Sequence, residues 1–293
     1  MTTFGVAAVV PHTRFGDGAR EANLETARKA ALSAAQQGAQ LVCFPETFPG
    51  QWRRPLAWDP VEDLKSIAVE AGVHVVAGFA EAVGADPDRG YNTLVLIDPE
   101  GNEVGRYRRT SPGIPGWLYA DGPQWDFDWI AATELPVFDT ALGRIGMLVC
   151  SEVYVPELSR VLALKGADVI VMPAGLTAAG SPLYATWHNL VWSRAIENLV
   201  YTVVSSNSLG EGGMAMVCSP EAVLADSTEE GVHVATVDLD RLRYLREEQD
   251  RRGVATQGRP WRTKPGVLRD WRVPAVWRGS PILWEFGDEE TPA

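Results

Sequence analysis

The chain has 293 residues, of which 46% are hydrophobic and 22% charged, and this composition is typical of a globular protein with a sizeable core. Its net charge of −12 argues against a nucleic-acid or anionic-membrane binder, because both tasks need a basic face. The longest apolar runs are too short to cross a bilayer, and the apolar N-terminal segment lacks the basic start of a signal peptide. The cytoplasm is therefore the expected location.

The first half of the chain alternates short apolar strands with helical patterns. One helix is expected from about Asp17, as its N-cap, to a stop before Gly38, and a second at 59–72 has Asp59 as N-cap and Pro60 first. The predicted strands are 4–10, 41–44, 74–80, 91–98 and 104–109, the last two joined as a hairpin by the turn at 99–102.

The second half continues the alternation and then changes character. Its predicted strands are 137–140, 144–150, 168–172 and 199–207, followed by two or three more up to Val237, and its predicted helices are 156–166 and 182–198. Alternating strands and helices with two hairpins indicate one α/β domain with mixed sheets over residues 1–250. The Arg-, Pro- and Trp-rich tail at 251–293 is expected at a subunit interface, the alternative being that it covers its own core.

Two strand ends carry side chains that suit catalysis, and in α/β proteins sites gather at the carboxyl ends of strands. Glu46 follows the apolar run LVCF, and Cys150 ends the run GRIGMLVC shortly before a predicted helix. A thiol near a helix N-terminus has its thiolate favoured, and a nearby carboxylate can act as its base. Taken singly, Cys150 also fits a small buried hydrophobe, and Glu46 a solvated carboxylate.

Metal and disulfide chemistry have no support in the sequence. The three cysteines form no CxxC pair, and an odd, sparse set predicts no disulfide framework. The four histidines are scattered, so we expect neither a metal nor a cofactor.

Several ordered motifs together resemble the nitrilase superfamily of carbon–nitrogen hydrolases, over residues 4 to about 246. They are LVCFPET, EGNEVGRYRR, GRIGMLVCSEVYVPELSR, ADVIVMPA and SRAIENLVYTVVSSN. The resemblance implies an αββα sandwich with two mixed sheets of the six-stranded type. It also implies paired subunits, a homodimer or a higher homo-oligomer, and a small amide or related molecule as substrate.

The family's Glu-Lys-Cys triad maps onto Glu46 and Cys150, with Arg109 where the lysine is expected. In this chemistry the cysteine attacks the carbon, the glutamate moves the proton and the cation stabilises the oxyanion. Arginine stays charged and has five donors, but its planar fork is larger than an ammonium group. Arg109 is the main departure from the family pattern.

Five further residues are predicted to line the substrate site. Ser151 follows the cysteine and offers its backbone amide to the oxyanion, and Glu152 fits the nitrilase-like branches. Trp52 and Trp117 are candidate pocket walls, with a core or interface role as the alternative. Asp121 is nearest to the place of the family's additional glutamate.

Three functions remain open from the sequence. The first is hydrolysis of a small carboxamide through a thioester on Cys150. The second keeps the cysteine but changes the reaction, for example to acyl transfer or a specialised biosynthetic step. The third is a non-catalytic relative. We rank them in this order, and the presence of both Glu46 and Cys150 argues against a non-catalytic relative, which needs neither residue.

Overall fold

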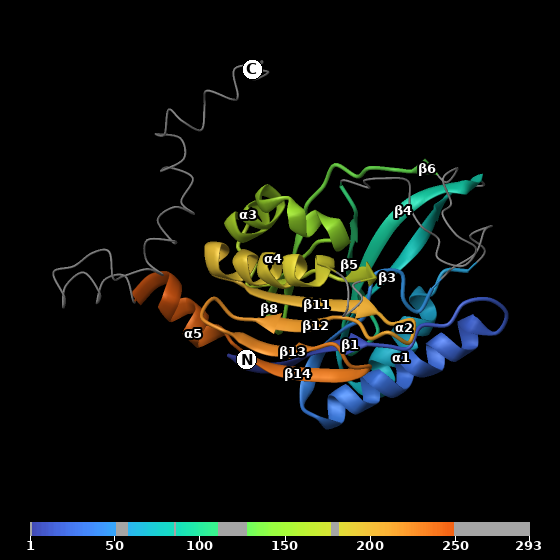
Figure 1. The fold of residues 1–293 in the computed structure, drawn as a ribbon, viewed down its shortest axis with the longest axis horizontal. Coiled ribbons are helices and arrows are strands. Elements are labelled where there is room, and N and C mark those ends of the chain that lie inside the picture. Colours follow the sequence, from blue (N-terminus) through green and yellow to red (C-terminus); the bar gives the residue numbers. More distant parts are fainter. Residues whose placement is uncertain (1, 51–57, 85, 111–127, 177–181, 249–293) are drawn as a thin grey trace, which may run out of the picture.

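The structure, a computed structural model, describes residues 2–50, 58–84, 86–110, 128–176 and 182–248. The predicted site residues Trp52, Trp117 and Asp121 lie outside these residues, as does the tail at 251–293. The fold of the described part consists of two mixed β-sheets and the helices that cover them (Figure 1).

The first sheet has the strand order β14-β1-β2-β3-β4-β5, and a short strand β6 pairs with β4. Strands β1, β2 and β3 run parallel to one another, whereas the remaining pairs along that path are antiparallel, so the sheet is mixed as predicted. Its strands are β1 Thr3–Val10, β2 Ala39–Cys43, β3 His74–Val83, β4 Asp86–Ile97, β5 Glu103–Arg108, β6 Asp128–Trp129 and β14 Gly231–Asp238.

The second sheet has the order β13-β12-β11-β9-β8-β7, with a short strand β10 paired to β11. Strands β8, β9 and β11 are parallel, and the outer pairs are antiparallel. Its strands are β7 Val137–Thr140, β8 Gly143–Met147, β9 Val169–Val171, β10 Ala174–Leu176, β11 Tyr201–Asn207, β12 Ala215–Cys218 and β13 Val223–Ser227.

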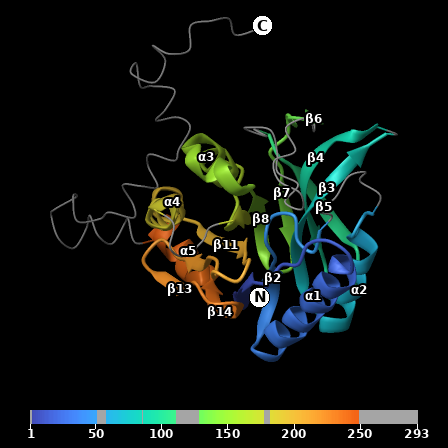
Figure 2. The ribbon, with the colours of Figure 1, turned by 45° about the vertical axis from the view of Figure 1, so that its right-hand side comes forward.

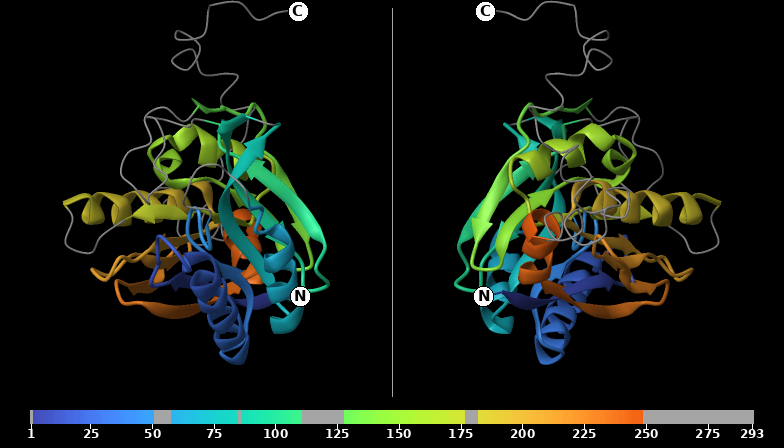
Figure 3. Two further views of the ribbon diagram at one scale, coloured as in Figure 1. Left: turned by 90° about the vertical axis from the view of Figure 1, so that its right-hand side faces the viewer. Right: turned by 90° about the vertical axis from the view of Figure 1, so that its left-hand side faces the viewer.

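Helices cover the outer face of each sheet and complete the αββα sandwich (Figures 2 and 3). On the first sheet lie α1 Ala19–Gln36 and α2 Val61–Ala71; on the second lie α3 Pro156–Leu164 and α4 Pro182–Asn198. A short helix α5, Leu239–Arg243, and one turn of π-helix at Tyr244–Glu248 follow β14. None of the helices in the described chain is long and apolar enough to span a membrane.

Strand alternation divides the core into two layers, as β1 illustrates. Phe4, Val6 and Ala8 belong to the cluster between the two sheets, whereas Ala7 and Val9 belong to the cluster beneath α1 and α2. Successive side chains of a strand point to opposite faces, so each parallel strand needs apolar residues at nearly every position. This requirement explains the continuous apolar runs in the sequence.

The strand ends of the two sheets meet at one place. The Ser205 hydroxyl on β11 donates to Cys43 O at the end of β2, at 2.7 Å. The backbone N–H of Glu46 donates to Ala174 O on β10, at 3.3 Å. The end of β2 and the segment that follows it are therefore bonded to β10 and β11, and the predicted base Glu46 lies at this junction.

The structure corrects two predicted helix starts. Helix α1 begins at Ala19, with Gly18 rather than Asp17 at its N-cap, because Gly18 takes a left-handed conformation (φ 74°). Helix α2 begins at Val61, one residue later than predicted. Asp59 still accepts the Val61 N–H at 2.9 Å, so the capping interaction is present although the boundary is shifted.

Candidate active site

Cys150 lies at a sharp turn of the backbone after β8. Val149 is extended, with φ −116° and ψ 120°, whereas Cys150 has a φ of 50°, which is uncommon for a residue other than glycine. The Cys150 N–H donates to Pro173 O at 2.7 Å, which ties the turn to the segment after β9. A short 3₁₀ helix, Cys150–Tyr154, starts here. Backbone strain of this kind clusters at functional sites.

The surroundings of the Cys150 sulfur favour the neutral thiol. Burial raises its pKa well above the ordinary value, and the Glu46 carboxylate raises the pKa further. Arg109 and the Gly175 backbone N–H act in the opposite direction without reversing the result. The sequence predicts that the helix start favours the thiolate, whereas burial of the sulfur raises the pKa of the thiol. A thiol that stays protonated at rest needs a base to react.

Glu46 is held in the junction by its backbone and is 5% exposed. The Asn207 side chain on β11 donates to Glu46 O at 2.9 Å, which adds to the Ala174 contact described above. Gly78 on β3 makes room for this loop, since a Cβ there would lie 2.7 Å from Thr47 N. The carboxylate oxygen Oε2 is buried without a hydrogen-bond partner among the described residues.

Arg109 directly follows β5, and only 7% of its surface is exposed. Its backbone N–H donates to Asn92 O at 2.9 Å and its carbonyl accepts from Ala132 N at 3.0 Å. The guanidinium lies between two groups of the site: Nη1 is 3.6 Å from Glu46 Oε1, and Nη2 donates a short hydrogen bond to Ser151 Oγ. The larger arginine therefore reaches both the carboxylate and the residue beside the cysteine.

Asn92 on β4 is a site residue that the sequence analysis did not single out. Its Nδ2 donates to Glu46 Oε1 at 2.6 Å, and its Oδ1 is buried with no hydrogen-bond partner among the described residues. A buried amide in the apolar strand YNTLVLI was the available signal, because buried polar side chains need partners. Glu46, Asn92, Arg109 and Ser151 are called the inner cluster below.

Ser151 and Glu152, both predicted to line the substrate site, differ in their surroundings. Ser151 is exposed and accepts from Arg109, so its hydroxyl stands at the open side of the inner cluster. Glu152 is completely buried, and its carboxylate accepts hydrogen bonds from Tyr107, Thr110 and the Val149 backbone. The structure thus places the Glu152 carboxylate inside the protein, between β5 and the cysteine turn.

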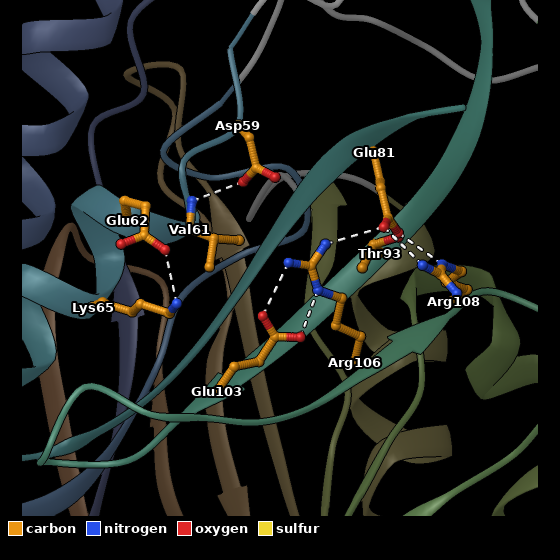
Figure 4. A network of polar contacts seen from close by, with 9 residues as sticks. All are labelled: Asp59, Val61, Glu62, Lys65, Glu81, Thr93, Glu103, Arg106 and Arg108. Carbon is orange, nitrogen blue, oxygen red and sulfur yellow. Dashed lines mark hydrogen bonds and ion pairs between the residues drawn. The ribbon is translucent and has the colours of Figure 1, made fainter. Parts of the chain in front are cut away.

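The arginines on the opposite face of β5 form a separate network (Figure 4). Arg108 donates twice to Glu81, with both distances 2.8 Å, and Arg106 donates to Glu81 at 3.0 Å and to Glu103 at 2.6 and 2.9 Å. The Thr93 hydroxyl also donates to Glu81, at 2.8 Å. Glu81, Thr93, Glu103, Arg106 and Arg108 are called the outer cluster below.

Together with Cys150, the inner cluster combines a partly buried thiol, a buried carboxylate and a fixed cation from three different parts of the chain. Such a set can transfer a proton, form a covalent bond to carbon and stabilise negative charge on oxygen. Within the described ranges, no group of three or more His, Cys, Asp or Glu side chains is arranged to hold a metal ion. The protein is thus an α/β sandwich that has the side chains a thiol-dependent hydrolase needs.

Comparison with known proteins assigns the chain to a family of such hydrolases. The profile of the carbon-nitrogen hydrolase family matches residues 6–247, and the chain belongs to that family. A nitrilase from Pyrococcus abyssi is 32% identical over 76% of this chain and 86% of its own. A deaminated glutathione amidase from Synechocystis sp. is 30% identical over 77% of this chain and 89% of its own. The protein is therefore an amidase-like carbon–nitrogen hydrolase.

A solved structure supports the same fold. It is a variant of an amidase from Nesterenkonia sp. AN1, with the acetamide moiety of fluoroacetamide added covalently at the active-site cysteine. Its TM-score is 0.69 at 22% identity, covering 85% of this chain and 96% of that one. The predicted αββα architecture is confirmed.

Proposed function

We propose that the protein hydrolyses the C–N bond of a small carboxamide through a thioester on Cys150. Glu46 is the general base and acid, and Arg109 stabilises the oxyanion in place of the family's lysine. Ser151 holds the guanidinium at the open side of the site and contributes its backbone amide to the oxyanion site. Acyl transfer and a non-catalytic role are the competing functions, and each predicts a different result in the experiments proposed here.

In the first half-reaction, Glu46 takes the proton of the Cys150 thiol as sulfur attacks the carbonyl carbon. The carbonyl oxygen becomes an oxyanion beside the Arg109 guanidinium. Glu46 then gives its proton to the nitrogen as the C–N bond breaks. Ammonia or an amine leaves, and the acyl group remains on sulfur.

In the second half-reaction, Glu46 takes a proton from a water molecule as the water oxygen attacks the thioester carbon. The same cation faces the new oxyanion. When the intermediate collapses, the C–S bond breaks and the sulfur regains its proton from Glu46. A carboxylic acid leaves, and the enzyme returns to its starting state.

The observation that carries this proposal is the state of Glu46. Its Oε1 has two positioning partners, Asn92 and Arg109, while the buried Oε2 has no hydrogen-bond partner among the described residues. Buried polar atoms without partners are costly and are found where function needs them. After burial, the charge of Glu46 is the largest cause that raises the pKa of Cys150, so the carboxylate and the thiol interact electrostatically.

We also propose that the protein forms a homodimer through the outer face of α3 and α4. Large apolar side chains are exposed there, at Val161, Leu164 and Leu183. Light scattering after size-exclusion chromatography should give about twice the chain mass of 31.9 kDa. A monomer at micromolar concentration would overturn this assembly without affecting the proposed reaction.

The reaction is tested with a panel of small amides and nitriles, with and without an amine acceptor. We expect ammonia release from amides without any acceptor, and an acyl adduct on Cys150 by intact mass. Product that forms only with the acceptor would replace hydrolysis by acyl transfer. If neither product nor adduct forms with any substrate, the catalytic proposal is wrong.

The role of Arg109 is tested by Arg109→Lys beside Arg108→Lys, a matched change at the neighbouring residue, whose side chain faces the outer cluster. An ammonium is a single point charge and cannot reach Glu46 and Ser151 together. We expect Arg109→Lys to lower kcat/KM about tenfold or more, and Arg108→Lys to leave it within about twofold. A rise in activity for Arg109→Lys would mean that the arginine damages an ordinary lysine site.

A further inference from the structure

We infer that Glu152 is a positioning residue whose buried carboxylate fixes Arg109 relative to Cys150. This inference rests on the proposed function, because it assigns Glu152 to the same site. It also differs from the predicted substrate-binding role of Glu152, since the carboxylate lies inside the protein and not at the open side.

We call the hydrogen bonds accepted by the Glu152 carboxylate the clamp. The first half of the clamp holds the segment that carries Arg109. The Thr110 backbone N–H and hydroxyl donate to Glu152 Oε1, at 3.0 and 2.9 Å. The Tyr107 hydroxyl contacts both carboxylate oxygens, at 2.8 and 2.7 Å. Tyr107 and Thr110 flank Arg109, so one carboxylate holds the Tyr107 side chain on one side of the arginine and the Thr110 backbone and side chain on the other.

The second half of the clamp holds the turn that carries Cys150. The Val149 backbone N–H donates to Glu152 Oε2 at 2.8 Å, directly before the cysteine. In return, the Glu152 N–H donates to Val149 O at 3.0 Å. The strained φ of Cys150 persists only if its surroundings over-determine it, and these bonds meet that need.

Burial makes the clamp rigid. Glu152 and Tyr107 are both 0% exposed, and hydrogen bonds to a buried charge are stronger than neutral ones in water. Burial, followed by the charge of Glu152, raises the pKa of Tyr107, so the phenol stays protonated and remains a donor. One carboxylate thus links two chain segments that are distant in sequence and holds the proposed cation and nucleophile at a set separation.

The clamp is tested without any substrate, by alkylating Cys150 with a charged and a neutral reagent. Arg109 attracts iodoacetate toward the sulfur but does not attract iodoacetamide, so the ratio of the two rates reports where the guanidinium lies. Unfolding would expose Cys150 and give the ratio of a free thiol, so circular dichroism must first show that each variant is folded under the labelling conditions. Peptide mapping separates Cys150 from Cys43 and Cys218.

Two variants loosen the Arg109 side and keep every formal charge: Thr110→Val and Tyr107→Phe. We expect each to lower the iodoacetate-to-iodoacetamide ratio about threefold to tenfold, because the cation shifts away from the sulfur. The matched control is Thr93→Val, which removes one hydroxyl–carboxylate hydrogen bond of similar length from Glu81 in the outer cluster. Its ratio should equal that of the wild type.

Hydrolysis supplies a second readout. The clamp predicts that Thr110→Val lowers kcat about tenfold while KM changes less than about twofold, since the oxyanion is formed only after binding. If both clamp variants keep the wild-type alkylation ratio, Glu152 does not position Arg109 and the inference is wrong. A lowered ratio in an enzyme without hydrolytic activity would support the clamp and contradict only the proposed reaction.

Discussion

The inner and outer clusters lie on opposite faces of β5 and use the same residue types in different ways. In the outer cluster, Arg108 and Glu81 form two hydrogen bonds at 2.8 Å, and Arg106 adds a third. In the inner cluster, the shortest ion-pair distance between Arg109 and Glu46 is 3.6 Å. The outer carboxylate is fully used by its partners, whereas the inner one keeps Oε2 without a hydrogen-bond partner among the described residues.

The difference shows how one strand separates structure from chemistry. Alternation sends Arg106 and Arg108 outward, where close pairing with Glu81 stabilises the sheet edge, and sends Tyr107 and Arg109 inward. A carboxylate that is saturated with donors is a weak base, because every bond favours its charged form. The longer separation at Glu46 therefore suits proton transfer, and the closer pairing at Glu81 suits stability.

Neutralising each carboxylate in turn tests whether the two clusters differ in function. Glu46→Gln removes the proposed base and should lower kcat about 10²- to 10⁴-fold, while iodoacetamide still labels Cys150. Glu81→Gln should leave kcat within about twofold at a temperature where the protein is folded. Steady-state kinetics on the best amide measures both. Equal losses would mean that the two clusters are not functionally distinct.

A second test concerns the donor that orients Glu46. Asn92→Ala removes the 2.6 Å hydrogen bond to Oε1 and leaves the carboxylate free to turn, so kcat should fall about 10- to 100-fold. The neighbouring Thr93→Val, which faces the outer cluster, should change kcat less than about twofold. If Asn92→Ala keeps full activity, Arg109 alone is sufficient to orient the base.

The sequence predicted the elements well because their signals are local. Apolar runs, Pro before helices and Gly after them located nearly every strand and helix, and the hairpin at 99–102 pairs as expected. Glu46 and Cys150 stood out because both follow apolar strands, and ordered motifs marked Arg109. These signals depend on neighbours along the chain, which a sequence displays directly.

The properties that the sequence did not predict depend on contacts between distant segments. The partner of Glu46 on β4, the buried state of Glu152 and the raised pKa of Cys150 arise only when the two sheets pack. Strand alternation alone predicts that the side chains of Arg108 and Arg109 point to opposite faces of the sheet. It does not predict their partners, because Glu81 and Ser151 lie 27 and 42 residues away.

A third test follows the pH dependence of Cys150 alkylation. Because burial raises the pKa of the thiol, its reaction with iodoacetamide should still increase about tenfold per pH unit between pH 8 and 10, without a plateau. Arg109→Gln removes a charge that lowers this pKa, so the rate at pH 8 should fall about tenfold, whereas Arg108→Gln should leave it unchanged. A plateau near pH 8 in the wild type would contradict the raised pKa of the Cys150 thiol.

The smallest expected effect belongs to the outer cluster and concerns stability in acid. Burial alone would raise the pKa of Glu81, but hydrogen bonds from Arg108 and Thr93, together with the arginine charges, hold the pKa below its ordinary value. A carboxylate with a lowered pKa in the folded state adds stability that is complete above its unfolded pKa and is lost as pH falls through the folded one. The loss should therefore occur below about pH 4.5.

Urea unfolding of wild type and Glu81→Gln at several pH values measures this contribution. At pH 7 the variant should be less stable by about 2 kcal/mol, since hydrogen bonds to charged groups are lost, and the difference should shrink below about pH 4.5. Glu100→Gln, a change at an exposed position on the β4–β5 turn, is the control and should show no pH-dependent difference. If the difference in free energy of unfolding is the same at every pH, the substitution acts through packing, and the charge of Glu81 does not stabilise the fold.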